Sequence, residues 1–218
     1  MYGFICGIRK LISICEEYAK QHGLIYNPKK SELLVFIGKN KSPTCVLPVQ
    51  LSGKLVNRVT EFKYLGHIVT ENLKDDKDME RERRALAVRA NMLARRFAGC
   101  SLPIKIALFK AYCQTFYTSG LWASCTQRAA HILRVQYNNA FRALLRLPYH
   151  CSASGMFADA HTDDYFAIMR KKVASVIQRV RVSTNSILKV FADRLDGPTM
   201  GRFIRLHVQN VAGSISLW

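Results

Sequence analysis

The stretch Thr70–Arg84, TENLKDDKDMERERR, separates two different patterns in the sequence. Acidic residues occur in its first part and arginines in its last part, which is the order of charge that a helix dipole favours. Apolar residues then recur at helical spacing over residues 78–98, so we expect an amphipathic helix there. Its inward stripe would be Met79, Leu86, Ala90, Leu93 and Phe97. Its outward face would carry Arg81, Arg84 and Arg95.

Helical patterns continue after this segment as far as residue 195. Ser101 is typical of a helix cap and Pro103 of a first turn. The helix that they begin would bury the stripe Ile104, Leu108, Ala111, Tyr112 and Thr115. A third helix over residues 127–146 would bury Leu133, Tyr137, Ala140, Phe141 and Leu144. Its outward arginines would be Arg128, Arg142 and Arg146. A fourth helix begins in HTDDYF, and a short one covers residues 186–195.

Short β-strand patterns precede residue 70. A helix over residues 8–22 is followed by strand candidates at 32–37, 46–51, 54–59 and 62–69, with a tight turn at Ser52-Gly53. We therefore expect an α+β fold, in which a small antiparallel sheet with one helix precedes a mainly α-helical bundle. The expected divisions are residues 1–75, residues 76–195 and an irregular tail, residues 196–218.

Charge limits the possible partners. The chain of 218 residues has a net charge of +18, and no Asp or Glu occurs between Arg83 and Arg146. Such an imbalance indicates a polyanion, either nucleic acid or an anionic membrane surface. No apolar run has the length of a membrane span, and compact apolar stripes suit a core, so we expect no membrane partner. Seven scattered cysteines are typical of reduced thiols in an intracellular protein, nuclear or cytoplasmic. The close pairs of ligands that a metal site requires do not occur, so we expect no metal site.

Four motifs occur in a fixed order along the chain. The first two are GLIYNPKKSELLVF, with Asn27, Lys30 and Ser31, and EFKYLGHIV, with Tyr64-Leu65-Gly66. LPIKIALFKAYCQTFYTSGLW follows, and then LRVQYNNAFRALLRLP with SASGMF. Together they resemble the reverse transcriptases of non-LTR (LINE-like) retrotransposons, and the resemblance covers residues 8–195. It implies the end of a palm domain, a thumb and a post-thumb region of an RNA-directed DNA polymerase.

The resemblance also implies roles for single residues. Residues 62–69 would be the primer-grip hairpin, in which Lys63 adds charge, Tyr64 offers a flat surface and Gly66 lets a sugar-phosphate chain approach. Lys30 would face the leaving pyrophosphate. The simpler alternatives are a buried strand that ends at a bend and a solvated Pro-Lys-Lys turn.

The family's catalytic pair of aspartates has no counterpart here. It would precede the helix at residues 8–22, where MYGFICG contains no carboxylate. Asp75-Asp76 and Asp163-Asp164 follow the grip motif, and both are expected to open helices. The resemblance thus implies a fragment truncated before its catalytic pair. We expect it to bind no Mg²⁺ of its own, to be inactive as a polymerase alone and to associate with the missing part.

The outward arginines are the expected contacts for phosphates of an RNA or DNA template–primer duplex. They are Arg81, Arg84, Arg95, Arg128, Arg142 and Arg146. Two other interpretations stay open: an independent basic helical module that binds nucleic acid, and an inert, decayed reading frame.

Overall fold

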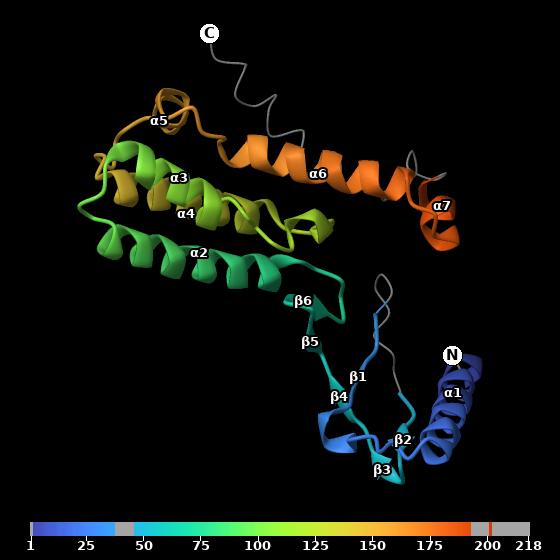
Figure 1. Ribbon diagram of the computed structural model, residues 1–218. Helices are drawn as coiled ribbons and strands as arrows, with labels where there is room; N and C mark the ends of the chain where they lie inside the picture. The colour runs from blue at the N-terminus through green and yellow to red at the C-terminus, as the bar shows by residue number, and fades with distance from the viewer. Residues whose placement is uncertain (1, 38–45, 193–200, 202–218) are drawn as a thin grey trace. The chain divides into compact units, whose positions relative to one another are not determined.

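The computed structural model describes residues 2–37, 46–192 and 201, and it divides into two compact units, residues 1–74 and 75–218. The class is mixed α and β, as expected: Figure 1 shows strands in the first unit and helices in the second. Within the part of the chain that is described, no helix combines the length and the apolar character needed to cross a membrane.

The first unit begins with a helix and continues in short strands. Helix α1 spans Tyr2–Gln21, and Gly23 follows it with a φ of +64°, a value that L side chains rarely adopt. A 3₁₀ turn, η1, covers Pro28–Lys30. The described residues form the strands β1 (Glu32–Leu34), β2 (Gln50–Leu51), β3 (Lys54–Leu55), β4 (Asn57–Val59), β5 (Glu61–Tyr64) and β6 (His67–Thr70).

The expectation of one small antiparallel sheet is wrong. The described strands form three separate pairs, of which β2–β3 and β5–β6 are antiparallel and β1–β4 is parallel. The predicted strand at residues 54–59 divides at Val56, whose N–H still donates to the Val49 carbonyl at 2.9 Å before the chain pairs with β1. The cause is the length of the strands: each has only two to four residues and ends before a third strand can pair with it.

The second unit is built from helices. They are α2 (Asp76–Arg96), α3 (Leu102–Cys113), α4 (Gln127–Leu145), α5 (Ala153–Asp159), α6 (Tyr165–Arg181) and α7 (Ser186–Ala192), with a 3₁₀ turn η2 at Ser119–Leu121. In Figure 1, α2, α3 and α4 lie side by side, and α2 and α4 run in the same direction. The predicted short helix at 186–195 is confirmed as far as residue 192. The tail at 196–218 lies outside the described residues apart from residue 201.

The core of this unit is aromatic. Tyr137 of α4 lies at its centre, stacked on Phe157 at a centroid distance of 5.2 Å and within 5.6 Å of both Phe109 and Phe116. The predicted inward stripe of α4 is confirmed, since all five of its members are buried. In α2 the first four members of the stripe are buried, and Phe97 packs half-buried against the core.

The predicted stripe of α3 is wrong. Ile104 and Tyr112 are about half exposed, whereas Phe109 and Cys113 are completely buried. Helix α3 is apolar around most of its circumference, so the spacing of apolar residues does not show which side faces the core. Phe109 decides the orientation, because its ring packs on Tyr137 and Phe141 at 5.1 and 4.8 Å.

Candidate nucleic-acid interface

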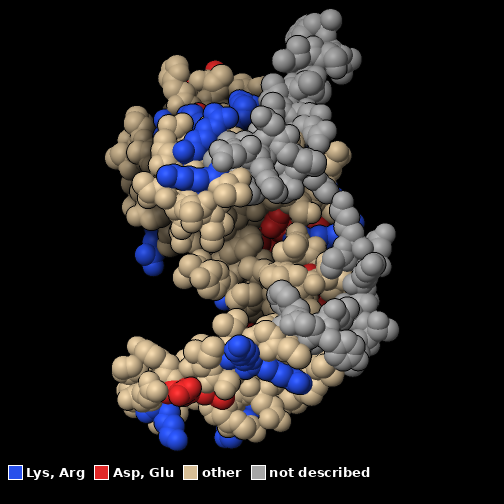
Figure 2. All heavy atoms as spheres, turned by 90° about the vertical axis from the view of Figure 1, so that its right-hand side faces the viewer, with Lys and Arg blue, Asp and Glu red and all other residues tan. Residues whose placement is uncertain are grey.

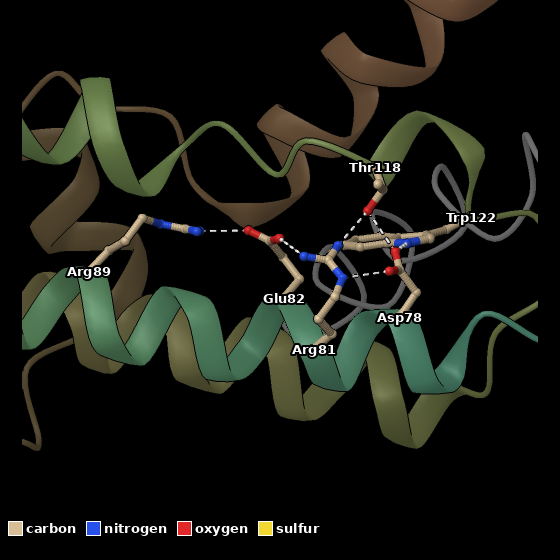
Figure 3. Close-up of polar contacts among 6 residues, drawn as sticks. All are labelled: Asp78, Arg81, Glu82, Arg89, Thr118 and Trp122. Carbon is tan, nitrogen blue, oxygen red and sulfur yellow. Dashed lines mark hydrogen bonds and ion pairs between the residues drawn. The ribbon is translucent and has the colours of Figure 1, made fainter. Parts of the chain in front are cut away.

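The first turns of α2 carry buried carboxylates that hold the segment between α3 and α4 in place. Asp78 is fully buried and accepts hydrogen bonds from Thr118 Oγ1 at 2.6 Å and from Trp122 Nε1 at 2.7 Å. Figure 3 shows these groups converging from α2 and from the segment around η2. Arg81 donates to Asp78 Oδ1 at 2.7 Å and to Thr118 at 2.9 Å. A buried acid with this many donors is stabilised in its charged form.

A second buried acid extends the network along α2. Glu82 accepts hydrogen bonds from Arg89 at 2.6 Å and from Arg81 at 3.2 Å, and it is 2 % exposed. The chain Arg89–Glu82–Arg81–Asp78 therefore spans about three turns on the inner side of α2 (Figure 3). Its role is structural, because it joins residues of α2 to the segment that leads into α4.

The expected outward position of Arg81 is therefore wrong. Its side chain is 24 % exposed and is held by two carboxylates and a hydroxyl, so it does not offer a free charge to phosphate. Helical projection places Arg81 opposite the apolar stripe. It does not show that the acids at positions 78 and 82 lie on the core side and draw the guanidinium with them.

Arg84 also pairs with an acid. Glu80 accepts two hydrogen bonds of 2.7 Å from Arg83 and one of 2.9 Å from Arg84. The hydrogen bond from Arg83, aided by Arg84, holds the pKa of Glu80 at about 2, although partial burial opposes the shift. Arg84 is nevertheless 74 % exposed, and such surface pairs contribute little to stability, so phosphate can compete for it.

Three of the predicted arginines are exposed and have no ion pair with any described residue: Arg95, Arg128 and Arg146. Arg95 lies in the last turn of α2 and Arg128 in the first turn of α4, while Arg146 caps the end of α4 with a φ of +57°. Because α2 and α4 run in the same direction, Arg95 and Arg146 lie at the same end of the unit (Figure 1). Arg128 and Arg146 are 18 residues apart, or about 27 Å along a helix.

Arg142 is half-buried and has a structural contact. Its guanidinium donates to the Cys151 carbonyl at 2.8 and 3.3 Å and to Asn139 Oδ1 at 3.0 Å. These acceptors are neutral, so its charge is not balanced by a described acid. Arg96 is exposed beside Arg95, and Arg170, Arg179 and Arg181 are exposed on α6. Figure 2, which faces the side of α7, shows Lys and Arg grouped on the helical unit with little Asp or Glu between them.

The proposed grip residues lie together on one hairpin of the first unit. Tyr64 pairs with His67 across a two-residue turn, Leu65-Gly66, in which both residues have positive φ, +46° and +86°. Lys63 and Tyr64 are exposed, the latter at 59 %. The turn gives a reason for glycine that is independent of any ligand, because two positive φ values define the hairpin turn that matches strand twist.

Lys30 lies on the surface at the end of η1. The Asn27 side chain accepts from the Lys29 N–H at 3.1 Å, and Ser31 Oγ donates to the Asn27 carbonyl at 3.0 Å. The Asn-x-x-Lys-Ser pattern thus builds a rigid turn that leaves the Lys30 side chain exposed. No described residue forms an ion pair with it.

In the two Asp-Asp pairs, the side chains of Asp75, Asp76 and Asp164 accept hydrogen bonds from backbone amides, whereas the Asp163 carboxylate pairs with Lys171 Nζ. Asp75 Oδ2 accepts from the N–H groups of Ala123 and Ser124 at 2.9 and 2.7 Å, and Asp76 Oδ1 accepts from the Thr126 N–H at 2.7 Å. Asp164 caps α6 by accepting from the Ala167 N–H at 2.7 Å, as expected for an acid that opens a helix. Among the residues described, no cluster of three or more His, Cys, Asp or Glu side chains is placed to hold a metal ion.

Comparison with known proteins gives no family for this chain: no family model, no curated protein and no solved structure matches it significantly.

Proposed function

We propose that the chain is part of a reverse transcriptase of the non-LTR retrotransposon type, with residues 1–75 at the end of the palm and residues 76–195 in the thumb and post-thumb region. Its role in this proposal is to bind a template–primer duplex of RNA or DNA. Support comes from the four ordered motifs and from a hairpin that presents Tyr64 and Lys63 at the predicted grip. It also comes from a helical unit with unbalanced positive charge.

The proposal rests mainly on the exposure of Arg95, Arg128 and Arg146 and on their lack of ion pairs with described residues. All three are exposed, and none forms an ion pair with a described residue, in a segment that contains no acid from residue 83 to residue 158. Phosphates attract such side chains wherever they occur along a backbone, so contacts of this kind position a duplex without reading its sequence.

The parent family uses Mg²⁺, and the residues present do not fit a two-metal site. Such a site needs carboxylates that are free to converge on the ions. One carboxylate oxygen each of Asp75, Asp76 and Asp164 accepts an amide hydrogen bond, and each of these residues belongs to a helix start. The Asp163 carboxylate pairs with Lys171. Under this proposal the chain alone binds nucleic acid without extending a primer, and another polypeptide segment supplies the catalytic carboxylates.

The test is fluorescence anisotropy with a labelled template–primer duplex, carried out beside vesicles of anionic lipid. We expect duplex binding that is independent of sequence, and weaker binding to vesicles. We also expect no primer extension with Mg²⁺ or Mn²⁺. Equal affinity for vesicles and duplex would contradict the proposed role, and so would extension that Asp75→Ala or Asp163→Ala abolishes.

A second candidate is an independent nucleic-acid-binding helical module. It is favoured by the main hydrophobic cluster of the described residues, whose buried members lie between Met79 and Met169, within the helical unit. The two candidates differ in what the first unit does. If the hairpin is a grip, replacing Lys63 and Tyr64 by alanine weakens the affinity for a primer end. If the helices act alone, the same replacement leaves the affinity unchanged.

A further inference from the structure

The turn that follows α4 holds an aromatic side chain outside the fold. Residues 148–151 form this turn, in which the Cys151 N–H donates to the Pro148 carbonyl at 3.1 Å. Arg142 fixes it to α4 through its hydrogen bonds to the Cys151 carbonyl. Tyr149 is 90 % exposed although the backbone on both sides is held.

The ring of Tyr149 is also oriented. The His150 ring lies against it at 5.3 Å and 87°, an edge-to-face arrangement of the kind that aromatic pairs prefer. By contrast, Tyr137 and Tyr165 of the same unit are buried in the core. A tyrosine normally buries its ring and exposes its hydroxyl, so a ring offered whole to solvent on a fixed turn is suited to a flat ligand.

Positively charged residues lie at the same end of the helical unit as this turn. Arg146 lies three residues before Tyr149, and α2 ends at the same end of the unit with Arg95 and Arg96 exposed (Figure 1). Lys105, half-buried, lies near the start of α3 at that end. The first acid after Glu82 is Asp159, at the far end of α5. An aromatic face among cations matches a base with its flanking phosphates.

We propose that this end of the helical unit binds an unpaired stretch of nucleic acid, with one base stacked on Tyr149 and phosphates against Arg146, Arg95 and Arg96. The inference rests on the proposed function and narrows it. Bases within a duplex already stack on each other and cannot offer a face to the ring, whereas single strands bind to aromatic platforms in this way. Tyr149 therefore favours the single-stranded part of a template over its paired part.

The test uses the full chain with labelled single strands of about twelve nucleotides, one RNA and one DNA, and with the duplex of the same sequence. Stacking on an aromatic side chain is lost on alanine substitution, so Tyr149→Ala is expected to weaken binding to at least one single strand about five-fold or more. Duplex affinity is expected to stay within about two-fold, because the paired bases do not reach the ring. Tyr149→Trp restores the single-strand affinity.

Tyr117→Ala is the matched control, since Tyr117 is also exposed, at 76 %, and lies outside the turn. It is expected to leave all affinities unchanged. Three results would overturn this inference and leave the proposed function standing. They are unchanged single-strand binding in Tyr149→Ala, an equal weakening of duplex binding in that variant, and failure of Tyr149→Trp to restore single-strand binding. A wild-type chain that binds neither strand nor duplex overturns the proposed function together with it.

Discussion

The indole Nε1 of Trp122 donates a 2.7 Å hydrogen bond to the buried carboxylate of Asp78, and this contact ties the start of α2 to the segment before α4. The same carboxylate holds Thr118 and Arg81. Removing it would leave a buried indole N–H and a guanidinium with fewer acceptors. A buried polar network of this kind is costly to break at one member.

Asp78→Ala is therefore expected to lower the free energy of unfolding by about 3–5 kcal/mol, the range seen when one partner of a buried pair is removed. Urea denaturation of the full chain, followed by tryptophan fluorescence and circular dichroism, measures the loss. Arg84→Ala is the control on the same helix, because its exposed ion pair contributes at most about 1 kcal/mol. Equal losses in the two variants would show that the network does not stabilise the helical unit.

Cys113 makes the stability of the helical unit sensitive to alkaline pH. Burial raises the pKa of its thiol from 9.0 to about 11, while Arg89 opposes the shift. The folded state thus keeps the proton longer than the unfolded state, so this stabilisation is complete below pH 9 and is lost as the pH rises toward 11. Cys113→Ala is expected to flatten the fall in unfolding free energy between pH 8.5 and 10.5. Parallel curves for the variant and the wild type would contradict this.

Gly66 is expected to be needed for the β5–β6 hairpin itself. At a φ of +86° any Cβ is strained, so Gly66→Ala is expected to cost about 1–3 kcal/mol of local stability. Hydrogen exchange at the amides of β5 and β6 measures this cost. Gly7→Ala is the control, because a Cβ at Gly7 meets nothing within 4 Å. Unchanged exchange in Gly66→Ala would show that the turn tolerates side chains.

The first unit is expected to exchange faster than the helical unit. Its described strands form only two-stranded pairs, and an isolated pair is marginal in water. Apolar side chains of α1 such as Leu11 and Ile14 are more than half exposed. Hydrogen exchange is expected to give low protection over residues 46–70 and high protection over residues 78–145. Uniform protection across both regions would show that the paired strands of the first unit are as stable as the helices.

The sequence predicted α4 well because its apolar residues follow one face, so that Leu133, Tyr137 and Leu144 are all buried. It failed for α3, where apolar residues occur on nearly every side and only the packing of Phe109 determines the orientation. The short helix α5 was not expected, since Ala153, Ser154 and Gly155 give no apolar period.

For the candidate site, sequence alone identified the exposed residues Arg95, Arg128 and Arg146. It misplaced Arg81, because the ion pairs of that residue involve Asp78 and Glu82, whose burial depends on Thr118, Trp122 and Arg89 from distant turns. Tyr149 carried no sequence signal, because its exposure follows from the fixed turn at residues 148–151.

The most direct test of the central claim is the salt dependence of duplex binding. Each neutralised phosphate releases counterions, so the plot of log K against log salt has a slope of roughly −0.9 per contact. Combined replacement of Arg95, Arg128 and Arg146 by alanine is expected to flatten the slope by up to about 3 and to weaken binding to all sequences alike. Replacing the exposed Lys10, Lys20 and Lys54 removes the same charge from the first unit and should leave the slope nearly unchanged. Identical slopes in the wild type and the arginine variant, or equal flattening in both variants, would contradict a duplex interface on α2 and α4.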